Sequence, residues 1–226
     1  MQIVREETLI SRGTYSASEA WRQTRSSLYD AIKRVDWPRG SGTFTIYPEA
    51  GKKSSMGNGV GPIKIGLMEE LNQQGWKREH RVDIAEGFRL GNTAPSALRS
   101  RNCFRVDIAG GFRLGKVDAV LDTSDGLVAL EWETGNISSS HRALNKMALG
   151  LLKGTLACGI LVVPSRKLYH FLTDRIGNWN ELEPYLDLWK SVPCENGILE
   201  IAVIEHDAES TSVPRIPKAT DGRALR

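Results

Sequence analysis

Three acidic residues in the middle of the chain, Asp118, Glu131 and Glu133, have the types and spacing to hold a divalent cation. The run 127–133 alternates so that both glutamates share one face of a predicted strand. The turn signal at 123–126 predicts a hairpin that sets Asp118 opposite Glu131. Opposed carboxylates repel each other unless a proton or a cation lies between them. We therefore expect a metal site, with a solvated surface hairpin that merely carries acids as the alternative.

Polar residues directly after this strand have side chains that suit a phosphate or a base edge. They stand at the start of a predicted helix that runs to about Lys153, and helix N-termini attract anions. Arginine and asparagine bind base edges through paired hydrogen bonds. Capping by Ser138 or Ser139, with exposed polar neighbours, is the alternative. The cluster comprises Asn136, Ser138, Ser139, Ser140, His141 and Arg142.

The elements around these residues predict an α/β fold. A capping-box pattern at Ser16 and Glu19 predicts a first helix that ends before Pro38, and Pro62 opens a second helix. The apolar run 156–163 fits a strand buried on both faces, and the strand-helix-strand succession predicts a parallel crossover. Further strands are expected at 43–47 and 198–204, and further helices at 166–176 and 181–190, the last with Asn180 as its N-cap.

The segment 81–91 recurs at 105–115 and differs there only at Glu86 and Gly110. Two copies are too few for a solenoid, so we expect a local duplication inside one domain that spans 1–226. Only the second copy leads into Asp118. Deleting 92–115 should therefore restore a single copy and leave function intact.

Global composition narrows the class of protein only weakly. Thirty basic and 27 acidic residues give a net charge of +3, which neither requires nor excludes a polyanionic partner. Three cysteines without CxxC spacing predict reduced thiols in a cytoplasmic protein. No stretch approaches the roughly 20 apolar residues that span a bilayer, so no membrane partner is expected. From about 210 onward the chain is expected to be an irregular basic tail.

The segment Glu131–Arg142, which reads EWETGNISSSHR, resembles the BamHI family of type II restriction endonucleases, the GGATCC-type enzymes. The resemblance continues in order along most of the chain, through Asn145-Lys146, Leu172–Arg175, Glu181–Tyr185, Ile216–Lys218 and Asp221-Gly222. It implies a central mixed β-sheet flanked by helices, with a restriction-endonuclease-like core of the PD-(D/E)xK type. It also implies a homodimer that cuts palindromic double-stranded DNA with Mg²⁺, at GGATCC or a GATC-core relative, without an organic cofactor. Since the chain stops soon after Asp221-Gly222, we expect a short-tailed member.

The resemblance also implies roles in metal binding. Asp118 and Glu131 resemble the metal-ligating carboxylates, helped by the Trp132 carbonyl, and Glu79 resembles a further ligand from a helix end. Glu133 stands where related nucleases have lysine, and a carboxylate there can accept a proton from the attacking water as general base. We expect two Mg²⁺ per active site. A plain helix-end charge is the alternative for Glu79, and the duplication lengthens the chain between Glu79 and Asp118.

Major-groove contacts are implied at five positions, with alternatives for some of them. Arginine suits guanine, asparagine suits adenine, and aspartate accepts from cytosine. Asp174 and Arg175 could instead form a local surface ion pair. For Lys64 the alternatives are a contact to phosphate, a contact to the active site, or a solvated lysine on its helix. The implied contacts are Asn136, Ser138, Arg142, Asp174 and Arg175.

The same resemblance implies a dimer surface, and more than one function is compatible with the sequence. Helices at 139–153 and 181–190 are the expected dimer surface, because a palindrome asks for twofold symmetry, although their apolar positions could equally be core. A sequence-specific DNA-binding protein with impaired cleavage is the alternative function, and a structure-selective repair nuclease is a third. Intact Asp118, Glu131 and Glu133 favour cleavage.

Overall fold

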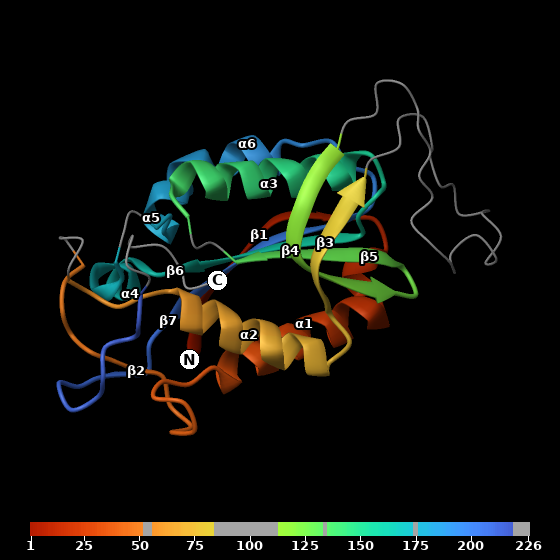
Figure 1. Ribbon diagram of the computed structural model, residues 1–226. Helices are drawn as coiled ribbons and strands as arrows, with labels where there is room; N and C mark the ends of the chain where they lie inside the picture. The colour runs from red at the N-terminus through yellow and green to blue at the C-terminus, as the bar shows by residue number, and fades with distance from the viewer. Residues whose placement is uncertain (52–55, 84–112, 133–134, 174–175, 219–226) are drawn as a thin grey trace.

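The computed structural model describes residues 1–51, 56–83, 113–132, 135–173 and 176–218 (Figure 1). Three predicted site residues, Glu133, Asp174 and Arg175, lie outside the described residues. Most of the duplicated segment and the end of the tail also lie outside them.

A mixed six-stranded sheet forms the centre of the molecule, in the order β1-β7-β6-β5-β4-β3. Strands β5, β6 and β7 are parallel, whereas β1, β4 and β3 pair antiparallel with their neighbours. The expected mixed sheet is confirmed. The strands are β1 Gln2–Arg12, β3 Lys77–Asp83, β4 Arg113–Thr123, β5 Gly126–Trp132, β6 Cys158–Pro164 and β7 Gly197–Glu205.

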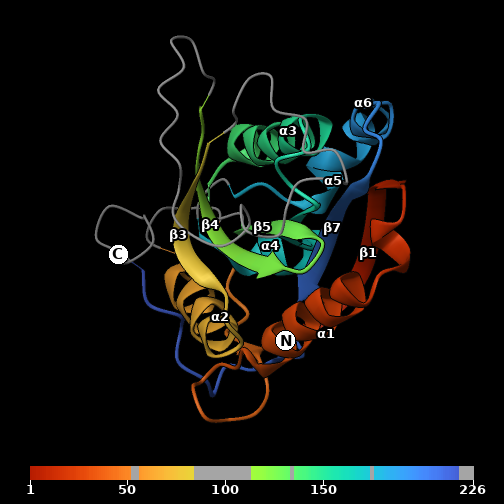
Figure 2. The same ribbon diagram turned by 90° about the vertical axis from the view of Figure 1, so that its right-hand side faces the viewer.

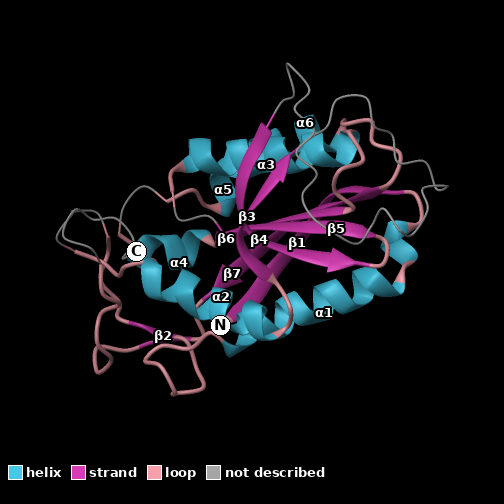
Figure 3. Cartoon of the chain, turned by 45° about the vertical axis from the view of Figure 1, so that its right-hand side comes forward, coloured by secondary structure: helices cyan, strands magenta, loops and turns pink. Residues whose placement is uncertain are grey.

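Helices cover both faces of the sheet, as the predicted α/β class requires. In Figures 1 and 3, α1 and α2 lie below the sheet, and α3, α5 and α6 lie above it. Figure 2 shows the same three layers from the side. The short α4 follows β6 at one end of the sheet. The helices are α1 Glu19–Arg34, α2 Gly61–Gln73, α3 Ile137–Leu152, α4 Arg166–Phe171, α5 Trp179–Leu182 and α6 Leu186–Lys190, with 3-10 turns at Tyr15–Ala17 and Glu183–Tyr185.

Strand β5 is buried on both faces, so the solvated surface hairpin is wrong. Val128 and Leu130 belong to the core cluster shared with α1 and α2, while Ala129 belongs to the cluster shared with α3. All three side chains are fully buried. The predicted alternation is thus confirmed, but both faces of this strand meet helices.

Helix α3 connects β5 to β6, which confirms the parallel crossover. Gly159 lets this helix pack closely on β6, because a Cβ at that position would lie 2.6 Å from the Cβ of Met147. Close packing over the sheet fixes the direction in which the first turn of α3 points.

Several element boundaries differ from the predictions. Ser18, not Ser16, caps α1 by accepting from the Trp21 N–H at 3.1 Å. The predicted helix at 166–176 ends at Phe171, and the one at 181–190 is split into α5, a 3-10 turn and α6. Asn178, not Asn180, is the N-cap, and its backbone N–H donates to the Glu181 carboxylate at 3.3 Å.

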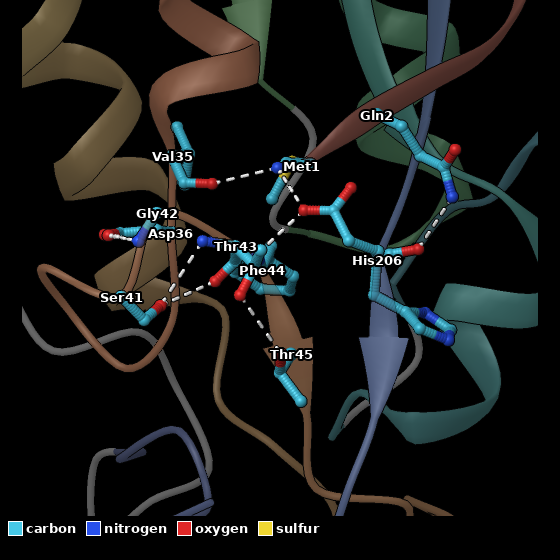
Figure 4. Close-up of polar contacts among 11 residues, drawn as sticks. Met1, Gln2, Val35, Asp36, Ser41, Gly42, Thr43, Phe44, Thr45 and His206 are labelled. Carbon is cyan, nitrogen blue, oxygen red and sulfur yellow. Dashed lines mark hydrogen bonds and ion pairs between the residues drawn. The ribbon is translucent and has the colours of Figure 1, made fainter.

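The start of β1 is tied to two loops on the opposite side of the sheet from α3. The Met1 amino group donates to the Val35 carbonyl at 3.1 Å and contacts Asp207 at 2.8 Å. Figure 4 also shows Gln2 reaching the His206 carbonyl. Nearby, β2 (Thr45–Ile46) pairs with β8 (Ala208–Glu209), shorter than the strand expected at 43–47.

The cysteines and the helices of the described residues bear on the expected reduced thiols and on the expected lack of a membrane span. Cys158 and Cys194 are buried free thiols. Within the described ranges, no helix has the length and apolar character needed to cross a bilayer.

Candidate active site

The hairpin of β4 and β5 has the predicted register. Ala119 pairs with Leu130, and the pairing continues to Thr123 and Gly126 around a two-residue turn. One step beyond Ala119 and Leu130, this register sets Asp118 opposite Glu131. Both residues stand near the end of β5, where the chain leaves the sheet for α3.

Asp118 is fixed by two contacts from different elements. Its Oδ2 accepts from the Trp132 N–H at 2.9 Å, which locks the carboxylate to β5. Its Oδ1 lies 2.6 Å from the Lys64 Nζ of α2, with side-chain exposures of 30% for the lysine and 18% for the aspartate. The ammonium of Lys64 therefore lies at the carboxylates themselves.

Glu131 lies deeper than Asp118, with 13% of its side chain exposed, and it has its own lysine partner. The Lys146 Nζ of α3 contacts the Glu131 Oε1 and also donates to the Lys116 carbonyl at 2.8 Å. Burial, followed by the charge of Asp118, raises the pKa of Glu131 above its usual value. Lys146 and Lys64 act in the opposite direction. Two cations thus compensate two closely placed carboxylates.

Glu79 lies in strand β3, not at a helix end, because α2 ends at Gln73. Pairing of Arg78 with Ala119 and of His80 with Val117 places Glu79 across from Asp118. The duplication therefore does not separate them. However, the backbone of Glu79 has a positive φ of 47°. Its side chain is 77% exposed and lies 3.4 Å from the Lys116 Nζ, so the described contacts join it to lysine rather than to Asp118.

The first turns of α3 place predicted DNA-reading residues beside the carboxylates. Asn136, not Ser138 or Ser139, caps the helix by accepting from the Ser139 N–H at 3.3 Å. Ser138, Arg142 and Lys146 follow at intervals of four and share one helix face. They line an open groove together with His141, Asn145 and Leu149.

The chain just after 174–175 packs against this helix start. The Gly177 N–H donates to the Gly135 carbonyl at 2.9 Å. A Cβ on Gly177 would lie 2.2 Å from the Ser140 Oγ, so only glycine fits this approach. Sequence reasoning gave no role to Gly177 or Lys146. The Asn145-Lys146 pair in the family motif was the available signal for the lysine.

The donor atoms of this site fit a hard divalent cation. Carboxylate oxygens are the ligands that Mg²⁺ prefers, and Asp118 and Glu131 would supply them. Among the residues that the structure describes, no group of three or more acidic, histidine or cysteine side chains is gathered as a metal site. A further oxygen would come from the Trp132 carbonyl or from Glu79. A bound cation would supply charge stabilisation at phosphorus and activation of water.

A mixed sheet between two helix layers, with paired carboxylates beside a helix start, defines the fold class of the restriction endonucleases. A solved structure of restriction endonuclease BglII in complex with a DNA 16-mer is similar in fold, with a TM-score of 0.57 at 11% identity. The similarity covers 92% of this chain and 79% of that one.

The chain belongs to the restriction endonuclease BamHI family, which matches residues 1–223. It is 41% identical to the type II restriction enzyme OkrAI of Oceanobacter kriegii over 226 residues, the full length of both chains. It is 32% identical to the type II restriction enzyme BamHI of Bacillus amyloliquefaciens over 211 residues, which are 92% of this chain and 84% of that one. The class is therefore that of the site-specific deoxyribonucleases, and the resemblance of the Glu131–Arg142 segment is confirmed.

Proposed function

We propose that this protein is a single-domain type II restriction endonuclease that makes Mg²⁺-dependent double-strand cuts in palindromic DNA, at GGATCC or a GATC-core relative. The opposed Asp118 and Glu131, placed directly before the start of α3, carry the proposal. One short stretch of chain thereby joins hydrolysis to DNA reading. Its proposed place of action is the cytoplasm.

The carboxylates and lysines have different proposed roles in phosphodiester hydrolysis. Asp118 and Glu131 hold the cation, with two Mg²⁺ proposed per active site. Glu133 accepts a proton from the attacking water. Lys64, 2.6 Å from Asp118, keeps positive charge beside the position proposed for the phosphate. Glu79 stays a proposed further ligand and would have to leave Lys116.

Base reading is proposed for the α3 start and the segment that packs on it. The exposed Arg142 side chain donates to the Ser139 Oγ at 3.4 Å, a long contact that guanine could replace. Ser138 is exposed on the same helix face. The Gly135–Gly177 hydrogen bond joins the chain that follows residue 175 to the start of α3. The proposed contacts remain Asn136, Ser138, Arg142, Asp174 and Arg175.

A homodimer is proposed because a palindrome presents two identical half-sites. Exposed apolar side chains lie at the end of α3 and, separately, on the 183–190 stretch. Leu152 is 44% exposed, Tyr185 49% and Leu188 62%. Both elements lie in the layer above the sheet (Figure 1). Light scattering at micromolar protein is expected to give twice the mass of one chain.

Incubation of plasmid DNA with the protein and Mg²⁺ tests the function directly. Discrete fragments whose ends map to one palindrome are expected. A gel shift at the palindrome with uncut DNA would instead establish a binding protein with impaired cleavage. Cuts confined to branched DNA would establish a repair nuclease.

A further inference from the structure

Lys146 links the proposed DNA-reading face of α3 to the proposed metal site. It follows Arg142 by four residues and Ser138 by eight, so the three side chains lie along one side of the helix. All three line the same open groove. This face therefore runs from the proposed base contacts to Glu131.

One ammonium group joins three elements at this point. The Lys146 Nζ contacts the Glu131 Oε1 on β5 and donates to the Lys116 carbonyl on β4 at 2.8 Å. Lys116 stands two residues before Asp118, so both proposed ligand positions are close to the anchor. Because α3 carries Lys146, a displacement of the helix would move the partner of Glu131.

Burial makes this contact more constraining than an exposed ion pair. Only 16% of the Lys146 side chain and 13% of the Glu131 side chain are exposed. A buried charge that loses its partner is strongly destabilised, whereas an exposed pair contributes little. Lys146 thus has a strong preference for the geometry that holds both Glu131 and Lys116.

We propose that Lys146 is a positioning residue that makes cleavage depend on correct base reading. When the α3 start docks on the right bases, Lys146 holds the Glu131 carboxylate in the orientation needed for the cation. When a wrong base displaces α3, Lys146 moves with the helix and Glu131 loses that orientation. The inference rests on the proposed function and names the physical link between its two halves.

Cleavage kinetics of Lys146→Met and Lys146→Arg test the link. Lys33→Met is the matched control, because it removes the same charge from an exposed position in the last turn of α1, outside the proposed dimer surface. At saturating DNA, Lys146→Met is expected to slow the single-turnover rate by about 10–100-fold. Its metal-free Kd for the site should stay within about twofold of the wild type. Lys146→Arg should recover part of the rate, and Lys33→Met should cut normally.

The discrimination between correct and changed bases during cleavage is a second measurement. A lysine with a merely structural role would not alter it. The ratio of single-turnover rates on the recognised site and on a site with one changed base is expected to fall in Lys146→Met. The ratio of the two binding constants should remain that of the wild type. A rate loss that is equal on both sites would overturn the coupling.

Binding of Mn²⁺, followed by electron paramagnetic resonance in the protein–DNA complex, needs no cleavage. Lys146→Met is expected to weaken Mn²⁺ binding about 10-fold or more, while Lys33→Met leaves the affinity unchanged. Unchanged affinity in both Lys146 variants would overturn the proposal even if the wild type did not cut. A loss of metal-free DNA affinity as large as that of Arg142→Met would also overturn it, by making Lys146 a DNA contact.

Discussion

Two largely buried glutamates of one sheet, Glu131 on β5 and Glu200 on β7, have different surroundings. Burial is the largest cause of a raised pKa at both residues. Glu131 faces a second carboxylate and contacts a lysine ammonium. Glu200, on β7, instead accepts from the Tyr29 hydroxyl at 2.9 Å and lies 3.4 Å from the Thr8 hydroxyl.

These different partners make Glu131 part of a site suited to cations, whereas Glu200 makes a polar contact within the fold. A second carboxylate beside Glu131 increases local negative charge, which a divalent cation can neutralise. Hydroxyl groups are the hydrogen-bond partners of Glu200, so no second carboxylate is needed there. The charge of Arg25, whose Nε donates to the Tyr29 hydroxyl at 3.3 Å, lowers the pKa of Glu200. Burial of a glutamate alone therefore does not identify a catalytic group, whereas the charges of its neighbours do.

Replacement of Glu131 is expected to have the largest effect on activity. Glu131→Ala removes a proposed ligand, so cleavage should fall by more than about 100-fold, while the metal-free DNA Kd is retained. Plasmid digestion and a gel shift measure the two quantities. Glu200→Gln is the control that should cut normally, and an active Glu131→Ala would remove Glu131 from the chemistry.

Replacement of Tyr29 should instead affect stability. Tyr29→Phe removes the hydrogen bond to Glu200 and leaves a buried carboxylate oxygen without that donor. The expected loss in the free energy of unfolding is about 1–3 kcal/mol, measured by urea denaturation, with cleavage unchanged below the transition. Normal stability together with lost cleavage in Tyr29→Phe would show that the Glu200 region supports cleavage, contrary to this account.

The ionisation of Glu200 should make protein stability depend on pH, with a smaller effect than the loss of the Tyr29 hydroxyl. Because its folded pKa is raised above the usual 4.5, its stabilising contribution is complete below that value and is lost as pH rises through the folded pKa. Glu200→Gln cannot lose the proton. Its melting temperature should therefore improve relative to the wild type between pH 5 and pH 8, and a constant difference would contradict this assignment.

Deletion of 92–115 should have the smallest effect on the site. Strands β3 and β4 pair up to Asp83 and Arg113, so the segment between them connects adjacent strand ends. The first copy ends in the same five residues, GFRLG, that precede Lys116. The shortened chain is expected to cut plasmid at a rate within about threefold of the wild type. Folding with loss of cleavage would show that the duplication supports the site.

Local patterns in the sequence were sufficient to predict the centre of the fold. The turn at 123–126 and the alternation in β5 determine the hairpin register, and the apolar run of β6 marks the crossover. Strand β1 was not predicted, because it is an edge strand with mostly exposed side chains. Its pairing with β7 shifts twice, between Ile3 and Arg5 and between Thr8 and Ile10, which breaks the alternation.

The site could be predicted only in part. Opposition of Asp118 and Glu131 follows from local hairpin geometry. The Lys64–Asp118 contact joins residues 54 positions apart and depends on how α2 packs. The position of Glu79 depends on a positive φ that its residue type does not favour. Long-range packing and backbone strain were therefore the missing information.

Metal binding to the paired carboxylates is the central claim, and Mn²⁺ titration of the DNA complex tests it most directly. Electron paramagnetic resonance should detect bound Mn²⁺ in the wild type and in Glu200→Gln at equal affinity. Glu131→Gln should lose that binding while it still binds DNA. Retained Mn²⁺ affinity in Glu131→Gln would contradict the assignment of the metal to the Asp118–Glu131 pair.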